Sequence, residues 1–183
     1  MVDTVELTAG RFLLRPCRPV DAEWVCRACQ DPDIQRWTRV PAPYRLDDAV
    51  GYVTDHVPQS WATGRGAPFG VFDALTGEGL ATVGLVSMDL TEGLAEVGYW
   101  VAPWARRRGI ATAGTLAVAR WAFGSLGVSR LTWLAEVGNT GSRAVAERAG
   151  FTIEGVLRDR VRVRDGSRAD AWIGSLLPSD LKS

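Results

Sequence analysis

The sequence predicts one mixed α+β domain over residues 1–183, built on a central, mostly antiparallel sheet of about seven strands with helices on both faces. Three observations support this prediction. The hydrophobic fraction of 46% and the charged fraction of 23% are those of an ordinary globular chain. Short apolar segments separated by glycine-containing turns fill the middle of the chain, and a helical apolar period follows them. No repeat, low-complexity tract or linker divides the chain, which favours a single domain.

The N-terminal third combines one strand with two helices. Residues 6–15 mix apolar and polar side chains and predict a first strand. A helix over 19–30 follows, opened by a proline and an aspartate and ended by an Asp-Pro turn. Residues 36–45 contain two prolines and predict an ordered loop. An aspartate at 47 is a candidate N-cap for a second helix that runs toward residue 56, with Pro58 beyond it.

The middle of the chain predicts an antiparallel meander. Residues 69–72 and 80–88 are strand-like, and the turn sequence Thr-Gly-Glu-Gly at 76–79 separates them. A second tight turn at 91–93 precedes a third strand over 94–101. Each turn is short, so neighbouring strands are expected to pair in hairpin fashion.

The apolar period changes after residue 101. A helical stripe with spacings of three and four is formed by Leu116, Ala119, Phe123 and Leu126. The remaining elements expected are a strand over 131–137, a short helix over 142–149, and strands over 151–157 and 170–177. This order places helices on both sides of the sheet.

Charge, cysteine and histidine usage exclude several function classes. The 21 basic and 21 acidic residues cancel, which argues against a non-specific nucleic-acid binder. The pair Cys26-x-x-Cys29 has no second pair or neighbouring histidine, so we interpret both as buried thiols and expect no metal site. His56 is the single histidine, which leaves little for a histidine-based catalytic triad.

The chain has no sequence feature of a membrane protein. No apolar run approaches the roughly 18 residues that cross a bilayer, and residues 1–4 do not begin a basic-then-apolar leader. We therefore expect a cytoplasmic location and no membrane partner.

The most informative segment is the basic turn that joins the strand over 94–101 to the next helix. It contains three consecutive arginines followed by the small residues Gly109 and Ala111. Main-chain N–H groups at a helix N-terminus bind anions, and small residues let a phosphate approach them. The arginines add charge-assisted hydrogen bonds, so a diphosphate suits this turn. A solvated arginine turn that only caps a helix is the alternative.

Several motifs, in order, resemble the GNAT superfamily of acyl-CoA N-acyltransferases. The turn Arg106-x-x-Gly109-x-Ala111 is similar to that superfamily's Q/R-x-x-G-x-G/A signature. Downstream, Asn139-x-x-Ser142 and Ala149-Gly150-Phe151 resemble its second CoA-side element. The segments Glu96-Val97-Gly98-Tyr99-Trp100-Val101 and Gly150-Phe151-x-x-Glu154-Gly155 are similar to the RimJ/RimL-like branch. The resemblance spans nearly the whole chain, but residues 94–155 carry its specific motifs.

The resemblance implies the GNAT fold and a place for acyl-CoA. In this family the strand ending at Val101 splays from the strand over 131–137, and the cofactor arm lies in the slot between them. Main-chain groups of the first strand pair with the pantetheine amides, the basic turn holds the diphosphate, and Asn139 reaches the arm from the other wall. The cofactor-binding residues so implied are Tyr99, Trp100, Val101, Arg106, Arg107, Arg108, Gly109, Ile110, Ala111, Thr112, Asn139 and Ser142.

The resemblance also directs attention to the catalytic groups. Many family members place a tyrosine seven residues after the asparagine, where this chain has Ala146. Ser142 lies one helical turn earlier on the same face and is our candidate for stabilising the departing thiolate; its alternative role is a helix cap. Glu96 is the candidate base, because a carboxylate in a partly apolar cleft has a raised pKa. Its alternative is a solvated carboxylate or a structural ion pair.

Family geometry implies that the two early helices and the loop over 36–44 cover the acceptor pocket. Trp37, Arg39 and Tyr44 are the candidate lining residues, and an arginine there would favour an acidic or carboxylate-bearing acceptor. The eight tryptophans, Trp61, Trp104 and Trp133 among them, are interpreted as packing residues.

These observations predict an N-acetyltransferase that moves an acetyl group from acetyl-CoA to a primary amine by direct transfer in a ternary complex. A protein N-terminus and a small amine both remain as acceptors, and succinyl-CoA remains as a larger donor. The alternatives are a non-catalytic acyl-CoA-binding module, favoured by Ala146, and a nucleotide-phosphate enzyme that uses the arginine turn. Whether the protein forms a homodimer is left open.

Overall fold

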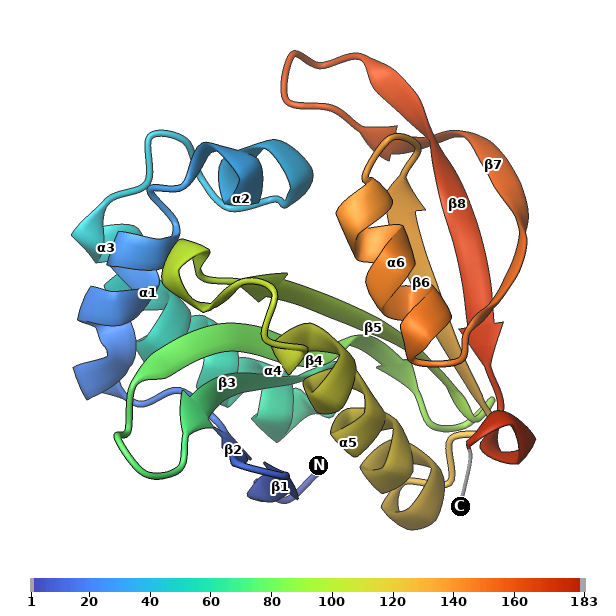
Figure 1. Ribbon diagram of the computed structural model, residues 1–183, viewed down its shortest axis with the longest axis horizontal. Helices are drawn as coiled ribbons and strands as arrows, with labels where there is room; N and C mark the ends of the chain where they lie inside the picture. Colours follow the sequence, from blue (N-terminus) through green and yellow to red (C-terminus); the bar gives the residue numbers. More distant parts are fainter. Residues whose placement is uncertain (1, 182–183) are drawn as a thin grey trace.

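A computed structural model describes residues 2–181, in which one eight-stranded sheet runs through the molecule (Figure 1). The strand order is β1-β2-β3-β4-β5-β6-β8-β7. The strands are β1 (Leu7–Ala9), β2 (Phe12–Arg15), β3 (Ala67–Asp73), β4 (Gly79–Asp89), β5 (Leu94–Val101), β6 (Arg130–Glu136), β7 (Thr152–Arg162) and β8 (Arg168–Leu176).

The sheet has eight strands instead of the seven expected, because residues 6–15 form a hairpin and not a single strand. Gly10 has a φ of +60°, which suits a tight turn and which glycine adopts without strain. The turn lets Ala9 pair with Phe12, so that β1 and β2 run antiparallel.

The prediction of a mostly antiparallel sheet is confirmed, since every pair of neighbouring strands is antiparallel except β5 and β6. The parallel pairing is short: Leu94–Val97 of β5 match 130–133 of β6. Beyond Val97 the strand β5 stays paired with β4 on its other side, and β6 stays paired with β8. The two strands therefore separate, and the splay expected from the family resemblance is present.

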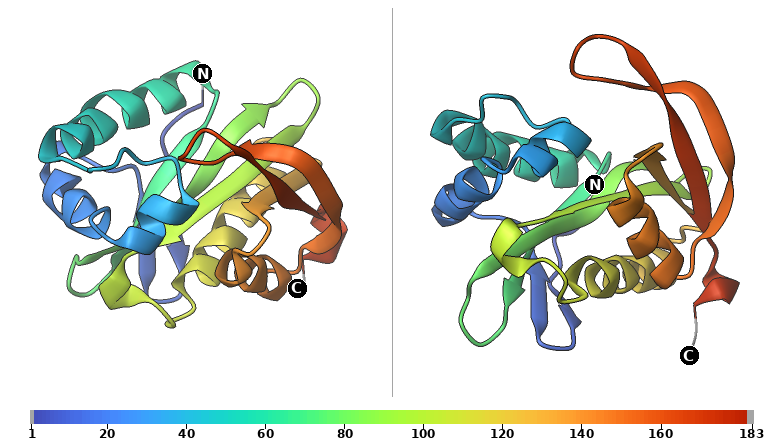
Figure 2. Two further views of the ribbon diagram at one scale, coloured as in Figure 1. Left: turned by 90° about the horizontal axis from the view of Figure 1, so that it is seen from above. Right: turned by 45° about the horizontal axis from the view of Figure 1, so that its top comes forward.

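Helices cover both faces of the sheet (Figures 1 and 2). One face carries α5 (Ile110–Ser125) and α6 (Thr140–Arg148), and the other carries the helices that precede β3. These are α1 (Ala22–Ala28), α2 (Pro32–Trp37), α3 (Leu46–Gly51) and α4 (Val57–Thr63), with a π-helical turn η2 at Tyr52–His56 and short 3-10 turns η1 at Pro19–Asp21, η3 at Pro103–Ala105 and η4 at Pro178–Asp180.

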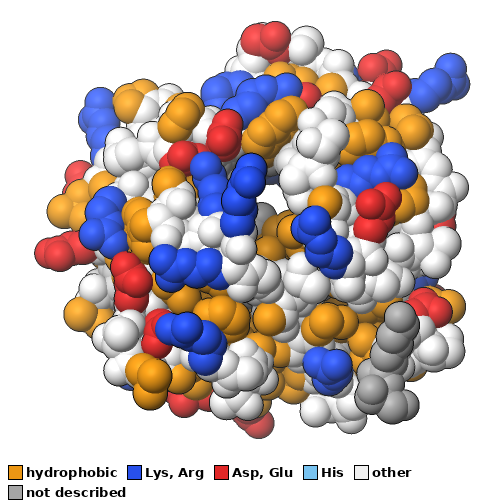
Figure 3. Space-filling model, viewed as in Figure 1, with side chains coloured by type: hydrophobic (Ala, Val, Ile, Leu, Met, Phe, Trp, Pro, Cys, Tyr) orange, Lys and Arg blue, Asp and Glu red, His pale blue; other side chains and the backbone are white. Residues whose placement is uncertain are grey.

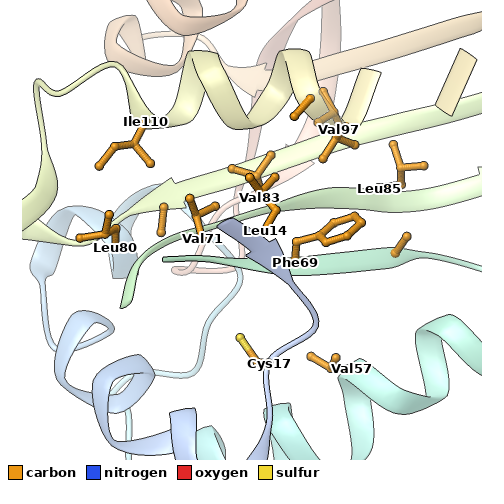
Figure 4. Close-up of a cluster of buried hydrophobic side chains, with 14 of the residues drawn as sticks. Leu14, Cys17, Val57, Phe69, Val71, Leu80, Val83, Leu85, Val97 and Ile110 are labelled. Atoms are coloured by element: carbon orange, nitrogen blue, oxygen red, sulfur yellow. The ribbon is translucent and has the colours of Figure 1, made fainter. Parts of the chain in front are cut away.

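The core between α5 and the sheet is built from buried aliphatic and aromatic side chains (Figure 4). Leu14, Val71 and Val83 lie on neighbouring strands beneath the helix, with Phe69 beside them and Ile110 opposite them. Burying each such side chain contributes about 1.5–3 kcal/mol to the free energy of unfolding. A Cβ on Gly114 of α5 would lie 3.0 Å from Val83, so glycine lets the helix sit close to the sheet.

The burial of α5 differs from the predicted stripe. Ala119 is buried, whereas Leu116 and Phe123 are half-buried. The inner face is formed instead by the buried residues Thr115, Val118 and Ala122, together with others of the same helix. The helix packs against both the sheet and α6, so its buried face is wider than one stripe.

The N-terminal helices also differ from the prediction at their ends. The Asp31-Pro32 turn begins a new helix, because the Asp31 carboxylate accepts a hydrogen bond from the amide of Ile34 and proline occupies the first helical position. Pro58 does not end the second helix, which continues through η2 into α4. The wider π turn immediately before Pro58 accommodates a residue that cannot donate a backbone hydrogen bond.

Candidate active site

The separation of β5 from β6 divides the candidate site into two sides. Side chains alternate along β5, so Glu96 and Trp100 face one side and Tyr99 faces the other. The Trp100 ring lies 5.8 Å from the Trp24 ring of α1, centroid to centroid. The Tyr99 hydroxyl instead donates a 2.8 Å hydrogen bond to the Ser142 carbonyl of α6. Glu96 therefore faces the α1 side of the sheet, and Tyr99 faces the α6 side.

The basic turn has the backbone geometry of an open helix N-terminus. Gly109 occupies the N-cap of α5 with a φ of +72°, and no side chain caps the helix. A Cβ on Gly109 would meet no atom within 4 Å, so the approach to the first amides of α5 is clear. Those amides have no partner within the helix. The exposed side chains of Arg107 and Arg108 flank this opening, and its geometry fits a diphosphate.

The side chain of Arg106 is held away from this opening. Its guanidinium donates to the carboxylates of Asp31 and Asp33, at the start of α2. Burial raises the pKa of Asp31, but the hydrogen bond and charge of Arg106 and the hydrogen bonds from backbone amides together outweigh it, and the pKa lies below its usual value. The Arg106 side chain therefore connects the turn to α2. Its guanidinium is already paired with carboxylates and does not point to the open amides.

Ser142 lies at the centre of a hydrogen-bonded group at the point where the strands separate. Its Oγ accepts from the Trp133 indole Nε1 at 3.0 Å and donates to the Tyr99 hydroxyl at 3.2 Å. Asn139, and not Ser142, caps α6, because its Oδ1 accepts from the Ser142 amide at 3.1 Å. The cap role considered for Ser142 therefore belongs to Asn139, and the Ser142 hydroxyl is turned toward the split.

Glu96 lies in a half-buried position on the opposite side of β5. Burial raises the pKa of Glu96 above its usual value, and the charges of Arg160 and Arg39 oppose the rise. Neither arginine has an ion-pair partner among residues 2–181, and both are exposed. The carboxylate thus combines a raised pKa with two nearby cations from the α2–α3 loop and from β7.

The three residues expected to line an acceptor pocket have different surroundings. Arg39 is exposed, and Trp37 is half-buried, with the Arg36 guanidinium 4.2 Å above its ring. Tyr44 is only 6% exposed, and its hydroxyl interacts with the Cys29 thiol. Burial raises the pKa of Tyr44 well above its usual value. We therefore correct the assignment of Tyr44, which belongs to the core between α1 and α3.

Segment 31–40 spans the mouth of the split through contacts that the sequence did not reveal. Arg36 forms a bidentate ion pair with Glu136 at the end of β6, at 2.9 and 2.5 Å. Arg164, in the β7–β8 hairpin, donates to the carbonyls of Gln35 and Val40. The tip of this hairpin reaches toward α2 (Figure 2). These partners are 100 or more residues apart, so no local pattern could pair them.

The surface is hollowed between these walls, with basic side chains around the opening (Figure 3). Segment 31–40 and the basic turn carry the exposed arginines Arg36, Arg39, Arg106, Arg107 and Arg108. Across residues 2–181, no three His, Cys, Asp or Glu side chains gather into a metal-binding group. No helix in that same range is long and apolar enough to cross a membrane.

Comparison with known proteins agrees with this geometry. The sequence profile of the acetyltransferase (GNAT) domain matches residues 11–152, which is more than half of the chain. The chain belongs to the GNAT acetyltransferase family. It is accordingly an acyltransferase by family, and both the RimJ/RimL-like resemblance and the GNAT fold are confirmed.

Two curated relatives come from Bacillus subtilis. YdaF, whose name assigns it provisionally to the ribosomal N-acetyltransferases, is 40% identical over 95 residues, or 52% of this chain and 51% of that protein. The matched stretch thus spans about half the length of that relative. YoaA, named an uncharacterized N-acetyltransferase, is 26% identical over 93% of this chain and 96% of its own length.

The solved structures show the same fold over the whole chain. RimJ of Mycobacterium smegmatis, in complex with a CoA disulfide, is 25% identical and has a TM-score of 0.84. The superposition covers 100% of this chain and 89% of RimJ. The residues present here fit such a cofactor on two observations: the unobstructed amides beside Gly109, and the stretch of β5 beyond Val97 that has no strand partner on the β6 side.

Proposed function

We propose that this protein is an acetyl-CoA-dependent N-acetyltransferase that acetylates a primary amine by direct transfer in a ternary complex. The observation that carries the proposal is the separation of β5 from β6 directly beyond Val97. Glu96 faces one side of this opening, and Tyr99 and Ser142 lie on the other. A donor in the split would therefore meet a base on one side and hydrogen-bond donors on the other.

The main chain would hold most of the cofactor. The unpaired edge of β5 at Tyr99, Trp100 and Val101 would pair with the amides of the pantetheine arm, as an added strand does. The amides of Ile110, Ala111 and Thr112 would bind the diphosphate, together with the exposed arginines of the turn. Asn139 uses its Oδ1 as a helix cap, so its amide nitrogen is the atom that would contact the arm.

Acetyl-CoA would supply a thioester whose acyl carbon the amine attacks. Glu96 would take the ammonium proton, a role for which its raised pKa suits it, since a base with a pKa nearer neutrality is more effective. Ser142 would donate a hydrogen bond to the departing sulfur. Ala146 is buried where family members place a tyrosine, and the Ser142 hydroxyl beside Tyr99 and Trp133 would act in its place.

We propose a peptide or protein N-terminus as the acceptor, with a small amine as the alternative. The relationship to YdaF, whose name assigns it provisionally to the ribosomal N-acetyltransferases, supports the first choice. Arg39 and Arg160 act on the same carboxylate from two separate segments and have no ion-pair partner among residues 2–181. They favour an acceptor that carries a carboxylate close to its amine, because each would gain a charge-assisted hydrogen bond.

A free-thiol release assay tests the function. The protein is incubated with acetyl-CoA and either acidic or basic N-terminal peptides or small amines, and released CoA is measured with and without acceptor. We expect acceptor-dependent release, fastest with a peptide that has an acidic residue next to its N-terminus. Succinyl-CoA is run in parallel, and slower release would identify the acetyl group as the preferred acyl group.

Thermal stabilisation by CoA and by ATP tests the two alternative functions, a non-catalytic acyl-CoA-binding module and a nucleotide-phosphate enzyme. CoA stabilisation without thiol release on any acceptor would contradict the enzyme and support a binding module. Stronger stabilisation by ATP than by CoA would contradict the cofactor assignment.

A further inference from the structure

The indole of Trp133 donates a hydrogen bond to Ser142, in the first turn of α6. Trp133 is the last residue of β6 that pairs with β5, opposite Val97, so it lies at the apex of the split. Its side chain is 1% exposed, and its Nε1 donates to the Ser142 Oγ at 3.0 Å. The sequence pattern classed Trp133 as a packing residue. Its one polar atom nevertheless touches the hydroxyl that the proposed reaction needs.

The hydrogen-bonding capacities of this group fix the direction of the Ser142 proton. An indole N–H only donates, so the Ser142 oxygen must accept from Trp133 and cannot return its own proton there. The Tyr99 hydroxyl already donates its one proton in the 2.8 Å hydrogen bond to the Ser142 carbonyl. Burial raises the pKa of Tyr99 to about 12, so the phenol stays protonated. The Ser142 proton is left pointing to the Tyr99 oxygen, through the weakest contact of the group at 3.2 Å.

We propose that Trp133 is a positioning residue for Ser142: by donating to one side of the serine oxygen, it leaves the serine proton on the side of Tyr99 and the split, from which the proton can turn to the leaving sulfur. This inference rests on the proposed function. When the carbon–sulfur bond breaks, its electron pair stays on the sulfur, and Ser142 turns its proton from Tyr99 to that atom without transferring it. The ammonium gives one proton to Glu96 before the amine attacks, and the nitrogen loses its second proton to the thiolate sulfur once the carbon–sulfur bond has broken, so CoA leaves as a thiol and charge and protons balance.

The arrangement explains how a serine can serve where family members have a phenol. A serine hydroxyl that freely rotates donates to the sulfur for only part of the time. Donation from Trp133 occupies one side of the oxygen and polarises the O–H bond, which strengthens the bond that serine donates in turn. The indole is buried on a strand, so its direction is fixed before the cofactor binds.

Trp133→Phe removes the indole N–H and keeps an aromatic ring, and Trp61→Phe is its matched control. Trp61 is 2% exposed, and its Nε1 also donates one hydrogen bond, to the Pro68 carbonyl at 3.1 Å, away from the site. We expect Trp133→Phe to lower kcat about 5- to 10-fold, the effect of one hydrogen bond, and to change the KM for acetyl-CoA less than 2-fold. Trp61→Phe should change neither by more than 2-fold.

A double-mutant cycle with Ser142→Ala separates positioning from general destabilisation. If Trp133 acts through the serine, Trp133→Phe lowers kcat no further in the Ser142→Ala background. Independent structural damage would lower it by the same factor in both backgrounds, and that result would overturn the proposal. So would a wild-type kcat for Trp133→Phe.

The hydrogen bond has a readout that does not depend on activity. In a ¹⁵N-labelled protein, the indole resonance missing from Trp133→Phe belongs to Trp133. Ser142→Ala should shift that resonance and speed its exchange with solvent while leaving the Trp61 resonance in place. An unmoved resonance would overturn the bond itself. Absence of thiol release by the wild type with every acceptor would instead refute the proposed function, and the positioning role with it.

Discussion

Gly109→Ala offers a direct test of the diphosphate site, because the structure separates its effect on stability from its effect on binding. Gly109 has a φ of +72°, and a Cβ there meets no atom within 4 Å. The substitution therefore causes no clash in the free protein. Its cost is the left-handed backbone, about 1–2 kcal/mol for an L-residue with a side chain. In a chain of 183 residues, each kcal/mol lowers Tm by about 2–4 °C.

Gly77 provides a control with nearly identical backbone geometry. It lies in the β3–β4 turn with a φ of +73°, and a Cβ there also meets nothing within 4 Å. Gly77→Ala should cost the same 1–2 kcal/mol, measured as the free energy of unfolding in urea. Equal losses in the two variants would show that the stability effect is purely conformational.

CoA affinity should separate the two variants. At Gly109 the new methyl group occupies open space beside the start of α5, and we expect it to keep a phosphate from at least one of the amides there. A hydrogen bond to a charged group contributes about 1.5–3 kcal/mol, so the Kd for CoA should rise about 10- to 100-fold. Isothermal titration of CoA into both variants measures this. If Gly109→Ala binds CoA as tightly as Gly77→Ala does, the diphosphate does not lie at this turn.

Three further predictions concern charged and titratable groups. Since burial raises the pKa of Glu96, the acidic fall in kcat/KM should lie above the usual carboxyl pKa. Glu96→Gln should remove that fall and lower the rate about 100-fold, and an unchanged pH profile would show that Glu96 is not the base. Because the Arg106 guanidinium binds Asp31, Arg106→Gln should lower the free energy of unfolding by about 1 kcal/mol or less and change the Kd for CoA less than 3-fold. A tenfold rise in that Kd, measured by isothermal titration, would mean that Arg106 contacts phosphate. Burial raises the pKa of Tyr99 from 10.0 to about 12, so the unfolded chain loses this proton at a lower pH than the folded protein, and the free energy of unfolding falls as the pH rises across that interval. Tyr99→Phe should make this fall less steep when the free energy is measured by urea unfolding. An equally steep fall in the variant would assign the effect to other groups.

The early helices show where local sequence signals were present but competed. Asp31 and Pro32 carry both the signal of a turn and that of a helix start, and the structure uses the second. Pro58 suggested a helix end, yet the helical segment continues past it into α4, because the π turn before Pro58 accommodates a residue without a backbone N–H. In each case contacts with distant parts of the chain, which no local pattern contains, accompany the outcome: Arg36 of α2 pairs with Glu136, and α4 packs on β3.

Tyr44 and Arg106 show the same limit within the candidate site. The sequence places Tyr44 in a loop above the slot, but cannot state that its ring turns inward to meet Cys29. It places Arg106 in the basic turn, but does not show that the guanidinium donates to Asp31, which lies 75 residues earlier in the chain. Side-chain direction depends on neighbours that are distant in sequence.

The sequence by itself determined most of the elements and the position of the turn at Gly109, because alternation, glycine turns and helix starts act over a few residues, and the resemblance of its motifs indicated the family. Only the tertiary structure decided which groups meet at the split: Trp133 on β6, Ser142 on α6 and Tyr99 on β5. Their contacts arise because one parallel strand pair ends after Val97, and that ending is a property of the whole sheet. Local periodicity specifies elements, whereas the chemistry depends on distances between them.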